Sequence, residues 1–258
     1  MAKASFHIGL TESQLKDVAV AILPGDPGRV PKIAKHLEGA APLANHREFH
    51  SMLGTYQGLS VLVISTGIGG PSAAICVEEL AMLGITRFLR VGTTGAIQDH
   101  IEPGDIIVPT AAVRLDGAST HIAPLGFPAV ADFSMVQAVK TSLLAANVRH
   151  HIGVCASSDT FYQGQSRQDS FQKGFVHSAM SHRFEEMKAL NVLSFEMECA
   201  TVFTQCAAYG LAAAAVLGVL VNRNRNEFPD ETVIKQTEDA VIQAALSSLP
   251  RLFTAFTA

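Results

Sequence analysis

Arg90 is the residue whose chemistry the sequence most needs to explain. It lies in the apolar stretch of residues 88–91, just before the small and hydroxyl-bearing stretch Gly92-Thr93-Thr94-Gly95. A guanidinium inside an apolar strand is costly to bury unless it meets an anion. Two interpretations are open: an internal ion pair, or an oxyanion site in which Arg90 supplies charge and Thr93 and Thr94 supply neutral donors. We expect the two glycines to let the backbone approach a ligand closely.

A second candidate for binding an anion is the turn Gly25-Asp26-Pro27-Gly28-Arg29. It places an arginine where a helix is expected to begin, and the amino end of a helix favours phosphate. No Gly-Lys-Ser/Thr follows, so it is not the phosphate loop of a nucleoside triphosphatase. An ordinary capped turn explains the same residues equally well.

Residues 157–167 contain a set of side chains that suits a planar ligand. Phe161 offers an aromatic face, Gln165 an amide that both donates and accepts, and Arg167 a fixed cation. Together they would fit a flat heterocycle that carries carbonyl groups. An ordinary surface loop is the alternative.

Two further segments carry polar groups in apolar surroundings. Phe195-Glu196-Met197-Glu198 places two carboxylates where a helix is expected to begin. Glu198 could complement the helix dipole or accept hydrogen bonds from two sugar hydroxyls. Asn222 and Arg223 follow a buried strand, either as a solvated turn or as a cover over a ligand.

Composition limits the class of protein. The chain has 258 residues, 48% of them hydrophobic and 16% charged, so we expect one compact α/β domain over residues 1–258. The net charge of -4 argues against nucleic acid or a membrane surface as a partner. Residues 1–7 do not resemble a signal peptide and residues 211–221 are too short to span a bilayer, so a cytoplasmic location is expected. The 4 cysteines have no metal-binding spacing and are expected to be buried free thiols.

Apolar periodicity predicts alternating strands and helices. Strands are expected at residues 18–23, 47–56, 59–65, 88–91, 106–113, 152–156 and 212–221. Helices are expected from the turn at residues 24–29 to about residue 37, at residues 72–83, 134–146, 183–190 and 198–209, and from about residue 231. This alternation favours a mostly parallel or mixed sheet sandwiched by helices. Several of the polar segments follow strands directly, where α/β proteins bind their ligands.

The motifs, taken together, resemble the nucleoside phosphorylase family. They are Leu23-Pro24-Gly25-Asp26-Pro27, Ser65-Thr66-Gly67-Ile68-Gly69, Arg90-Val91-Gly92-Thr93-Thr94-Gly95 and Phe195-Glu196-Met197-Glu198. The resemblance runs from about His7 to the last helix. It implies a single domain with a mixed, barrel-like central sheet flanked by helices, assembled as a homohexamer of dimers that share active sites.

The resemblance also implies a role for each site residue. Phosphate would be bound by Gly25, Arg29, Arg90 and Thr93, and by Arg47 of the dimer partner. Ribose would be bound by Thr93, Met197 and Glu198, and by the partner's His7. The base would be bound by Thr94, Gly95, Phe161, Gln165, Arg167 and Glu196, with Arg223 as a cover over it. Arg90, Glu198, Gln165 and Arg167 would carry the catalysis. Glu48, Ile68 and Ser72 match positions that hold a monovalent cation, such as potassium, between subunits in some relatives.

The implied reaction is phosphorolysis of a nucleoside, with phosphate as co-substrate and no cofactor required. Purine-specific relatives carry an aspartate after the strand that here ends at Val221, where this chain has Asn222 and Arg223. This departure, together with Gln165 and Arg167, favours a pyrimidine nucleoside. Uridine is the expected substrate, and deoxyuridine and thymidine are alternatives. A nucleosidase, which would use water, and a non-catalytic nucleoside-binding protein are the competing hypotheses.

Overall fold

The structure is a computed structural model that describes residues 4–226 and 228–254. Residues 1–3 of the N-terminal stretch lie outside the described residues, as do residues 227 and 255–258. Within the described ranges, no helix combines the length and the apolar character needed to cross a membrane.

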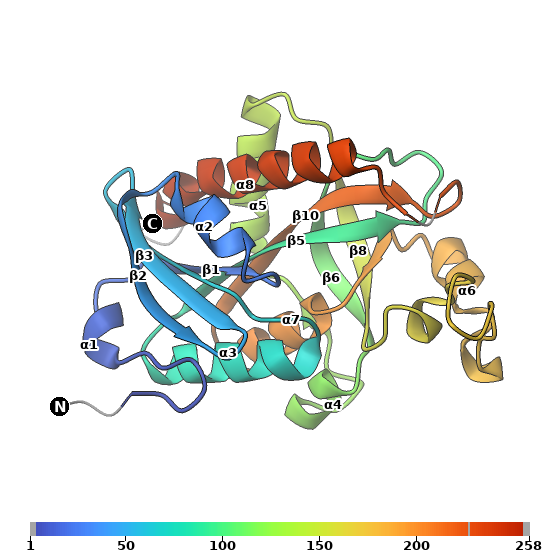
Figure 1. Cartoon of the computed structure of the whole chain (residues 1–258), viewed down its shortest axis with the longest axis horizontal. Helices are drawn as coiled ribbons and strands as arrows, with labels where there is room; N and C mark the ends of the chain where they lie inside the picture. The colour runs from blue at the N-terminus through green and yellow to red at the C-terminus, as the bar shows by residue number, and fades with distance from the viewer. Residues whose placement is uncertain (1–3, 227, 255–258) are drawn as a thin grey trace.

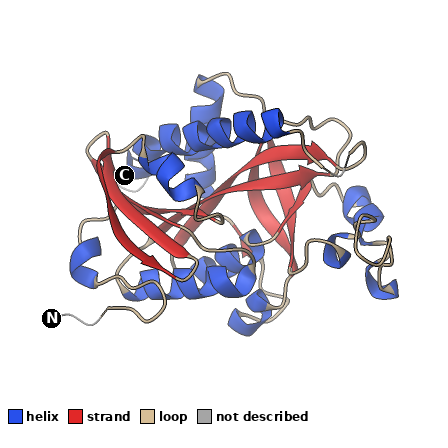
Figure 2. Ribbon diagram, in the orientation of Figure 1, coloured by secondary structure: helices blue, strands red, loops and turns tan. Residues whose placement is uncertain are grey.

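Ten strands form one connected mixed sheet (Figures 1 and 2). They are β1 (Val20–Pro24), β2 (Glu38–His46), β3 (Phe49–Tyr56), β4 (Leu59–Ile64), β5 (Arg87–Ala96), β6 (Ile106–Leu115), β7 (Ala129–Val130), β8 (His150–Ser158), β9 (Ser194–Glu196) and β10 (Ala212–Asn222). Their order is β10-β6-β8-β9-β5-β1-β4-β3-β2, with β7 on β6. Because β10 also pairs with β5, the strands β5, β10, β6, β8 and β9 close into a barrel, which confirms the predicted barrel-like sheet.

Helices cover both faces of this sheet. They are α1 (Glu12–Leu15), α2 (Arg29–Ala34), α3 (Gly70–Met82), α4 (Ala118–Ile122), α5 (Phe133–Ala145), α6 (Arg183–Ala189), α7 (Cys199–Tyr209) and α8 (Glu231–Thr254), with short 3₁₀ turns η1 (Gln163–Gln165) and η2 (Ser178–Met180). In β1, Ala21 and Leu23 pack with α3 and α7, whereas Val20 and Ile22 pack with α2, α5 and α8. A central parallel strand buried on both faces explains the unbroken apolar run of β1.

Most of the predicted elements are confirmed, with boundaries shifted by a few residues. Gln57 and Gly58 close the β3–β4 hairpin, and both have positive φ angles, 50° and 82°, as a tight hairpin turn requires. Asp132 caps α5 by accepting a 2.9 Å hydrogen bond from Met135 N. Gly210 ends α7 in the left-handed conformation.

Several segments differ from the prediction, and the short elements α1, α4 and β7 were not predicted. β2 was not predicted as a strand; it lies at the sheet edge and is largely exposed, so it lacks an apolar signal. The expected loop after Val91 is strand instead, because Gly92 to Ala96 keep pairing with β10. The segment before α7 begins with β9, where Phe195 pairs with Gly95.

The polar segments that follow the parallel strands β1 and β4 meet at the carboxyl ends of these strands. Thr66 N, just after β4, donates a 2.9 Å hydrogen bond to Pro24 O at the end of β1. An α/β sheet is expected to bind its ligand at such an edge.

Candidate active site

A cavity of about 310 Å³ opens at this edge of the sheet. It is lined by Gly25, Asp26, Arg29, Ile68, Arg90, Gly92, Thr93, Thr94, Gly95, Phe161, Gln165, Arg167, Phe195, Glu196, Met197, Glu198, Leu220, Val221, Phe228 and Pro229. Most residues that the sequence assigns to phosphate, ribose and base therefore lie around one space.

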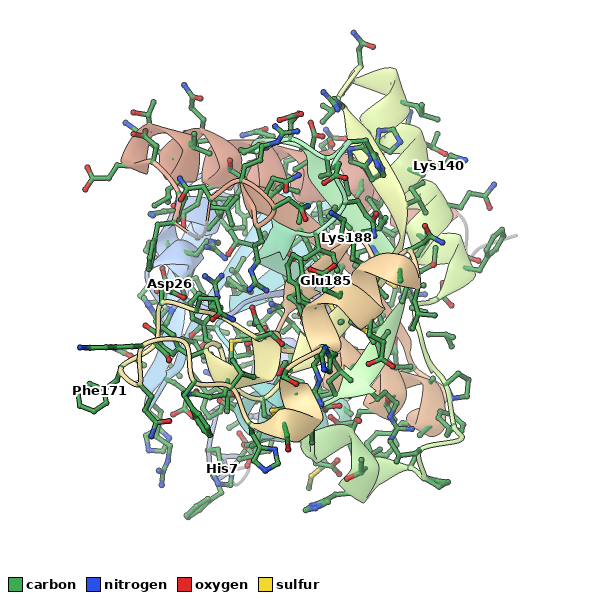
Figure 3. All side chains as sticks on the ribbon, turned by 90° about the vertical axis from the view of Figure 1, so that its right-hand side faces the viewer. His7, Asp26, Lys140, Phe171, Glu185 and Lys188 are labelled. Atoms are coloured by element: carbon green, nitrogen blue, oxygen red, sulfur yellow. The ribbon has the colours of Figure 1, made fainter. Side chains whose placement is uncertain are left out.

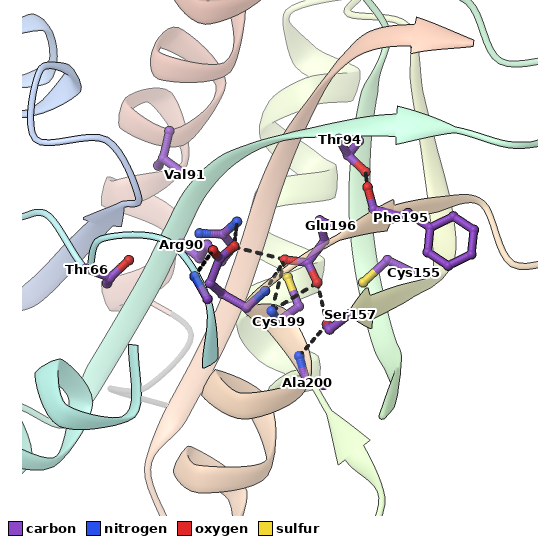
Figure 4. A network of polar contacts seen from close by, with 12 residues as sticks. Thr66, Arg90, Val91, Thr94, Cys155, Ser157, Phe195, Glu196, Cys199 and Ala200 are labelled. Carbon is purple, nitrogen blue, oxygen red and sulfur yellow. Dashed lines mark hydrogen bonds and ion pairs between the residues drawn. The ribbon is translucent and has the colours of Figure 1, made fainter. Parts of the chain in front are cut away.

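Arg90 lines the cavity and is buried, and Figure 4 shows it close to Glu196. Its Nε donates to Glu196 Oε2 at 3.3 Å, and its Nη2 donates to Glu198 Oε2. Burial alone would lower the pKa of Arg90, but attraction by Glu198 and Glu196 outweighs it and raises the pKa above the ordinary value. Nη1 is buried without a hydrogen-bond partner, 4.0 Å from where a Cβ on Gly25 would stand. The internal pair and the anion site proposed from the sequence can therefore coexist.

Glu198 connects Arg90 to the loop after β4. Its Oε1 accepts a 2.6 Å hydrogen bond from Gly69 N, while its other oxygen contacts Arg90. Burial raises the pKa of Glu198 above its ordinary value, and Arg90 offsets only part of this effect.

Glu196 acts as a support behind Arg90. Its carboxylate accepts hydrogen bonds from the backbone N–H groups of Glu198 and Cys199, at 2.9 Å to Oε2 in both cases, and from the Ser157 hydroxyl. Ser157 Oγ in turn accepts from Ala200 N at 2.8 Å. These bonds fix the carboxylate that holds Arg90 Nε, and a fully bonded group of this kind is poorly placed to contact a base.

Two glycines make room for arginines. A Cβ on Gly92 would stand 2.9 Å from Arg90 Nη2, and one on Gly95 would stand 3.0 Å from Arg223 Cδ. The sequence predicted that these glycines let a ligand approach. In the structure the close approach is made by the protein's own cationic side chains.

Arg29 lines the cavity and is held by a residue of α8. Its Nη2 and Nε donate to Glu238 Oε1 at 2.9 and 3.3 Å, and its Nη1 donates to Val91 O at 3.3 Å. Its side chain is only 9% exposed. The guanidinium is thus fixed at the cavity before any ligand binds.

The other end of the cavity is aromatic and amide-bearing. Arg167 Cζ lies 3.9 Å from the centre of the Phe161 ring, a stacked cation–π contact. Gln165, at the end of η1, and Arg167 are both buried and line the cavity. Ser166 between them has a φ of 55°, which turns the chain in the left-handed conformation.

Residues 19–257 match the sequence profile of the Phosphorylase superfamily. The chain belongs to this superfamily. This confirms the family indicated by the motifs.

Several relatives in the superfamily match nearly the whole chain. It is 49% identical over 249 residues to the uridine phosphorylase of Haemophilus influenzae, covering 96% of this chain and 98% of that protein. It is 50% identical over 247 residues to the uridine phosphorylase of Escherichia coli (strain K12), covering 96% and 97%. A guanosine phosphorylase of Halorubrum lacusprofundi is 32% identical over 242 residues, covering 92% and 93%.

Among the predicted functional residues, five do not line the cavity of their own chain: His7 and Arg47, which were assigned to the partner's site, Glu48 and Ser72, which were assigned to a cation between subunits, and Arg223, which was assigned to the base site. Arg47 is exposed in the two-residue turn between β2 and β3 and has a φ of 57°. Its Cζ atom lies 5.9 Å from the centre of the Phe6 ring. His7 Nδ1 lies 2.6 Å from Glu79 Oε1, and Figure 3 shows His7 apart from the cavity residue Asp26. Arg223 is buried, with Cζ 5.0 Å from the Phe184 ring centre.

Two places in the described part of the chain bear on metal binding: the predicted cation site, and one cluster of three potential ligands. Ser72 Oγ donates to Glu48 Oε1 at 3.0 Å, so two of the three predicted cation ligands are in contact. Cys155, Glu196 and Cys199 have ligand atoms within 4.8 Å of one another. Burial raises the pKa of both thiols, and Glu196 already accepts bonds from Arg90 and backbone N–H groups, so this cluster is a poor cation site. All 4 cysteines are buried and free, as predicted.

Several residues that line the cavity were not predicted from the sequence, among them Asp26, Phe228 and Pro229. Asp26 lies inside a motif that was identified. Its Oδ1 also accepts a 2.8 Å hydrogen bond from Gly28 N, which stabilises the turn. Phe228 and Pro229 follow β10, and the position after a parallel strand is the signal that could have indicated them.

Proposed function

We propose that this chain catalyses the reversible phosphorolysis of uridine to uracil and ribose 1-phosphate, in pyrimidine nucleoside salvage. The two relatives at about 50% identity that are named uridine phosphorylases support the substrate. One observation carries the reaction type: Arg90 presents a buried Nη1 without a partner beside Gly25, while its other nitrogens are held by carboxylates. A buried cation with a donor left over suits an anionic co-substrate such as inorganic phosphate.

In this proposal the cavity orients phosphate against C1′ of the ribose. Arg90 and Arg29 hold the nucleophile at the inner end, and Glu198 accepts hydrogen bonds from ribose hydroxyls. As the glycosidic bond lengthens, positive charge grows on the sugar and negative charge on the base. Gln165 and Arg167 then donate to the uracil carbonyl oxygens, where the negative charge develops. Much of the rate enhancement comes from proximity, and no covalent enzyme intermediate is needed.

Several finer features belong to the proposal. We place Arg47 and His7 in the active site of a dimer partner, because neither lines the cavity of its own chain. A homohexamer of such dimers follows from the family resemblance. We also propose one phosphorylase domain over residues 1–258, a cytoplasmic location, and a monovalent cation at Glu48, Ile68 and Ser72, of which Glu48 and Ser72 already contact each other.

A purine substrate is the second candidate, because one relative is named a guanosine phosphorylase. The geometry of Asn222 argues against it. Its Nδ2 donates to Ile101 O at 2.7 Å and to Gln98 O at 2.9 Å, so this side chain supports the backbone and offers no carboxylate to a base. Uracil, with two carbonyl acceptors, suits Gln165 and Arg167 better.

Phosphorus NMR on the reaction mixture tests the proposal. With uridine and inorganic phosphate, we expect the inorganic signal to fall and a ribose 1-phosphate signal to rise in equal amounts. Free ribose without any new phosphorus signal would indicate a nucleosidase. Guanosine, tested under the same conditions, distinguishes the purine alternative.

A further inference from the structure

Glu238 on α8 does not line the cavity but forms hydrogen bonds with Arg29, which does. Its Oε1 accepts from Arg29 Nη2 at 2.9 Å and from Arg29 Nε at 3.3 Å. Its Oε2 accepts from Lys32 Nζ at 2.6 Å. The contact therefore joins the last helix of the chain to the expected phosphate end, and in Figure 1 α2 lies directly beside α8.

This contact leaves Arg29 able to bind an anion. A guanidinium has five N–H groups, and the bonds to Glu238 and Val91 O account for three of them, so each terminal nitrogen keeps a further N–H. The Glu238 side chain is 13% exposed and Arg29 is 9% exposed, so water competes weakly for this pair. Lys32 supplies a second positive charge, and the group of three side chains has a net charge of about +1.

Glu238 is well suited to remain ionised in this role. Burial raises its pKa, but hydrogen bonds from Lys32 and Arg29 outweigh that effect and hold the pKa below the ordinary value. A charged carboxylate fixes a guanidinium more firmly than a neutral acceptor does.

On the basis of the proposed function, we propose that Glu238 is a positioning residue for phosphate: it holds Arg29 in the orientation in which its remaining N–H groups meet the co-substrate. The competing view is that Glu238 is an internal anion that occupies Arg29 and must be displaced by phosphate. The two views predict opposite effects when Glu238 is replaced. Positioning predicts weaker use of phosphate, whereas competition predicts tighter use, because a negative charge near the dianion has been removed.

The test compares Glu238→Ala and Glu238→Gln in the full-length protein by varying phosphate at saturating uridine, and then uridine at saturating phosphate. We expect Glu238→Ala to raise the KM for phosphate roughly tenfold or more while the KM for uridine stays near the wild-type value. Glu238→Gln keeps a carbonyl oxygen that can accept from Arg29, so its KM for phosphate should lie between those of wild type and Glu238→Ala. Asp239→Ala, which removes the exposed carboxylate at the next position of α8, is the matched control and should match wild type.

A KM for phosphate in Glu238→Ala that equals or falls below the wild-type value overturns the inference. So does an equal rise in the KM for phosphate and for uridine, since that would indicate a general structural defect. The melting temperature of each variant is measured alongside. The proposed function is tested separately in the same assay, because only its failure would let wild type release uracil at full rate without phosphate.

Discussion

Arg90 donates a hydrogen bond to Glu198, so the side chain proposed for phosphate and the side chain proposed for ribose are in direct contact at the wall of the cavity. Glu196 accepts a hydrogen bond from Nε of the same guanidinium (Figure 4). In the proposed complex, phosphate and the ribose of the nucleoside would thus both lie next to this buried ion pair. Removal of either partner would leave an uncompensated charge in a buried place.

The first prediction is that Arg90→Ala cripples phosphorolysis. Loss of a charged contact to the transition state should cost roughly 3 kcal/mol or more, on the order of a hundredfold in kcat/KM. Arg90→Lys keeps the charge but loses the planar fork, and should also fall well below wild type. Steady-state rates at saturating phosphate provide the measurement, and near wild-type turnover in Arg90→Ala would refute the assignment.

The second prediction concerns the base. Uracil offers two carbonyl oxygens to Gln165 and Arg167, whereas adenine would bring an amine against a guanidinium that can only donate. A site left with unpaired polar groups can discriminate by up to about 10⁴. We therefore expect a strong preference for uridine over adenosine and cytidine, reduced in Gln165→Ala and Arg167→Ala. Values of kcat/KM for the three nucleosides test this, and equal cleavage of adenosine and uridine by wild type would contradict it.

The third prediction is that active sites are shared between two chains. Arg47→Ala and Arg90→Ala should each be inactive alone, but a hybrid dimer would combine an intact Arg90 from one chain with an intact Arg47 from the other. After subunit exchange, a one-to-one mixture should recover up to about a quarter of wild-type activity.

The matched control for that experiment mixes Arg90→Ala with Glu198→Ala. Both residues line the cavity of the same chain, so no hybrid contains an intact site and the mixture should stay inactive. Absence of recovery in the Arg47 and Arg90 mixture, after verified exchange, would argue for sites built from one chain.

The fourth prediction concerns acid stability at Glu79, which anchors the N-terminal segment. Burial raises the pKa of Glu79, but hydrogen bonds from Ile8 N, from the His7 ring and from His7 N outweigh it, so the pKa is lowered below its ordinary value of 4.5. A carboxylate with a lowered pKa stabilises the fold above pH 4.5, and this contribution is lost as the pH falls through the lowered value.

Glu79→Gln should therefore cost about 2 kcal/mol of unfolding free energy near pH 7 and lose less than wild type between about pH 5 and pH 3. Urea unfolding at several pH values measures this. Glu185→Gln, at an exposed position of α6 that Figure 3 labels, is the control. Parallel stability curves for wild type and Glu79→Gln over that pH range would contradict the prediction.

Much of the architecture was predictable because its signals are local. The apolar run of β1 and the residues Gln57 and Gly58 at a hairpin turn indicate their structure from nearest neighbours alone. β2 was missed because it is largely exposed at the sheet edge, and edge strands need no apolar alternation. β5 was cut short because Gly92 and Gly95 look like a loop, whereas their pairing partners lie in the distant strands β10 and β9.

The sequence predicts those residues of the candidate site that belong to recognisable motifs. Gly25, Arg90, Gln165 and Glu198 stand in recognisable segments, and all line one cavity. Glu238 was missed because it contacts Arg29 across 209 residues of chain and belongs to no motif. Contacts of this kind arise because the fold brings α8 close to α2, which a single sequence does not reveal.

Uracil release from uridine, measured with and without inorganic phosphate, tests most directly whether this chain is a phosphorylase. We expect a rate that rises with phosphate to saturation and falls to near zero in phosphate-free buffer, with Arg90→Ala slow at every phosphate concentration. Uracil release at the full rate in phosphate-free buffer would contradict phosphorolysis and would make this chain a nucleosidase.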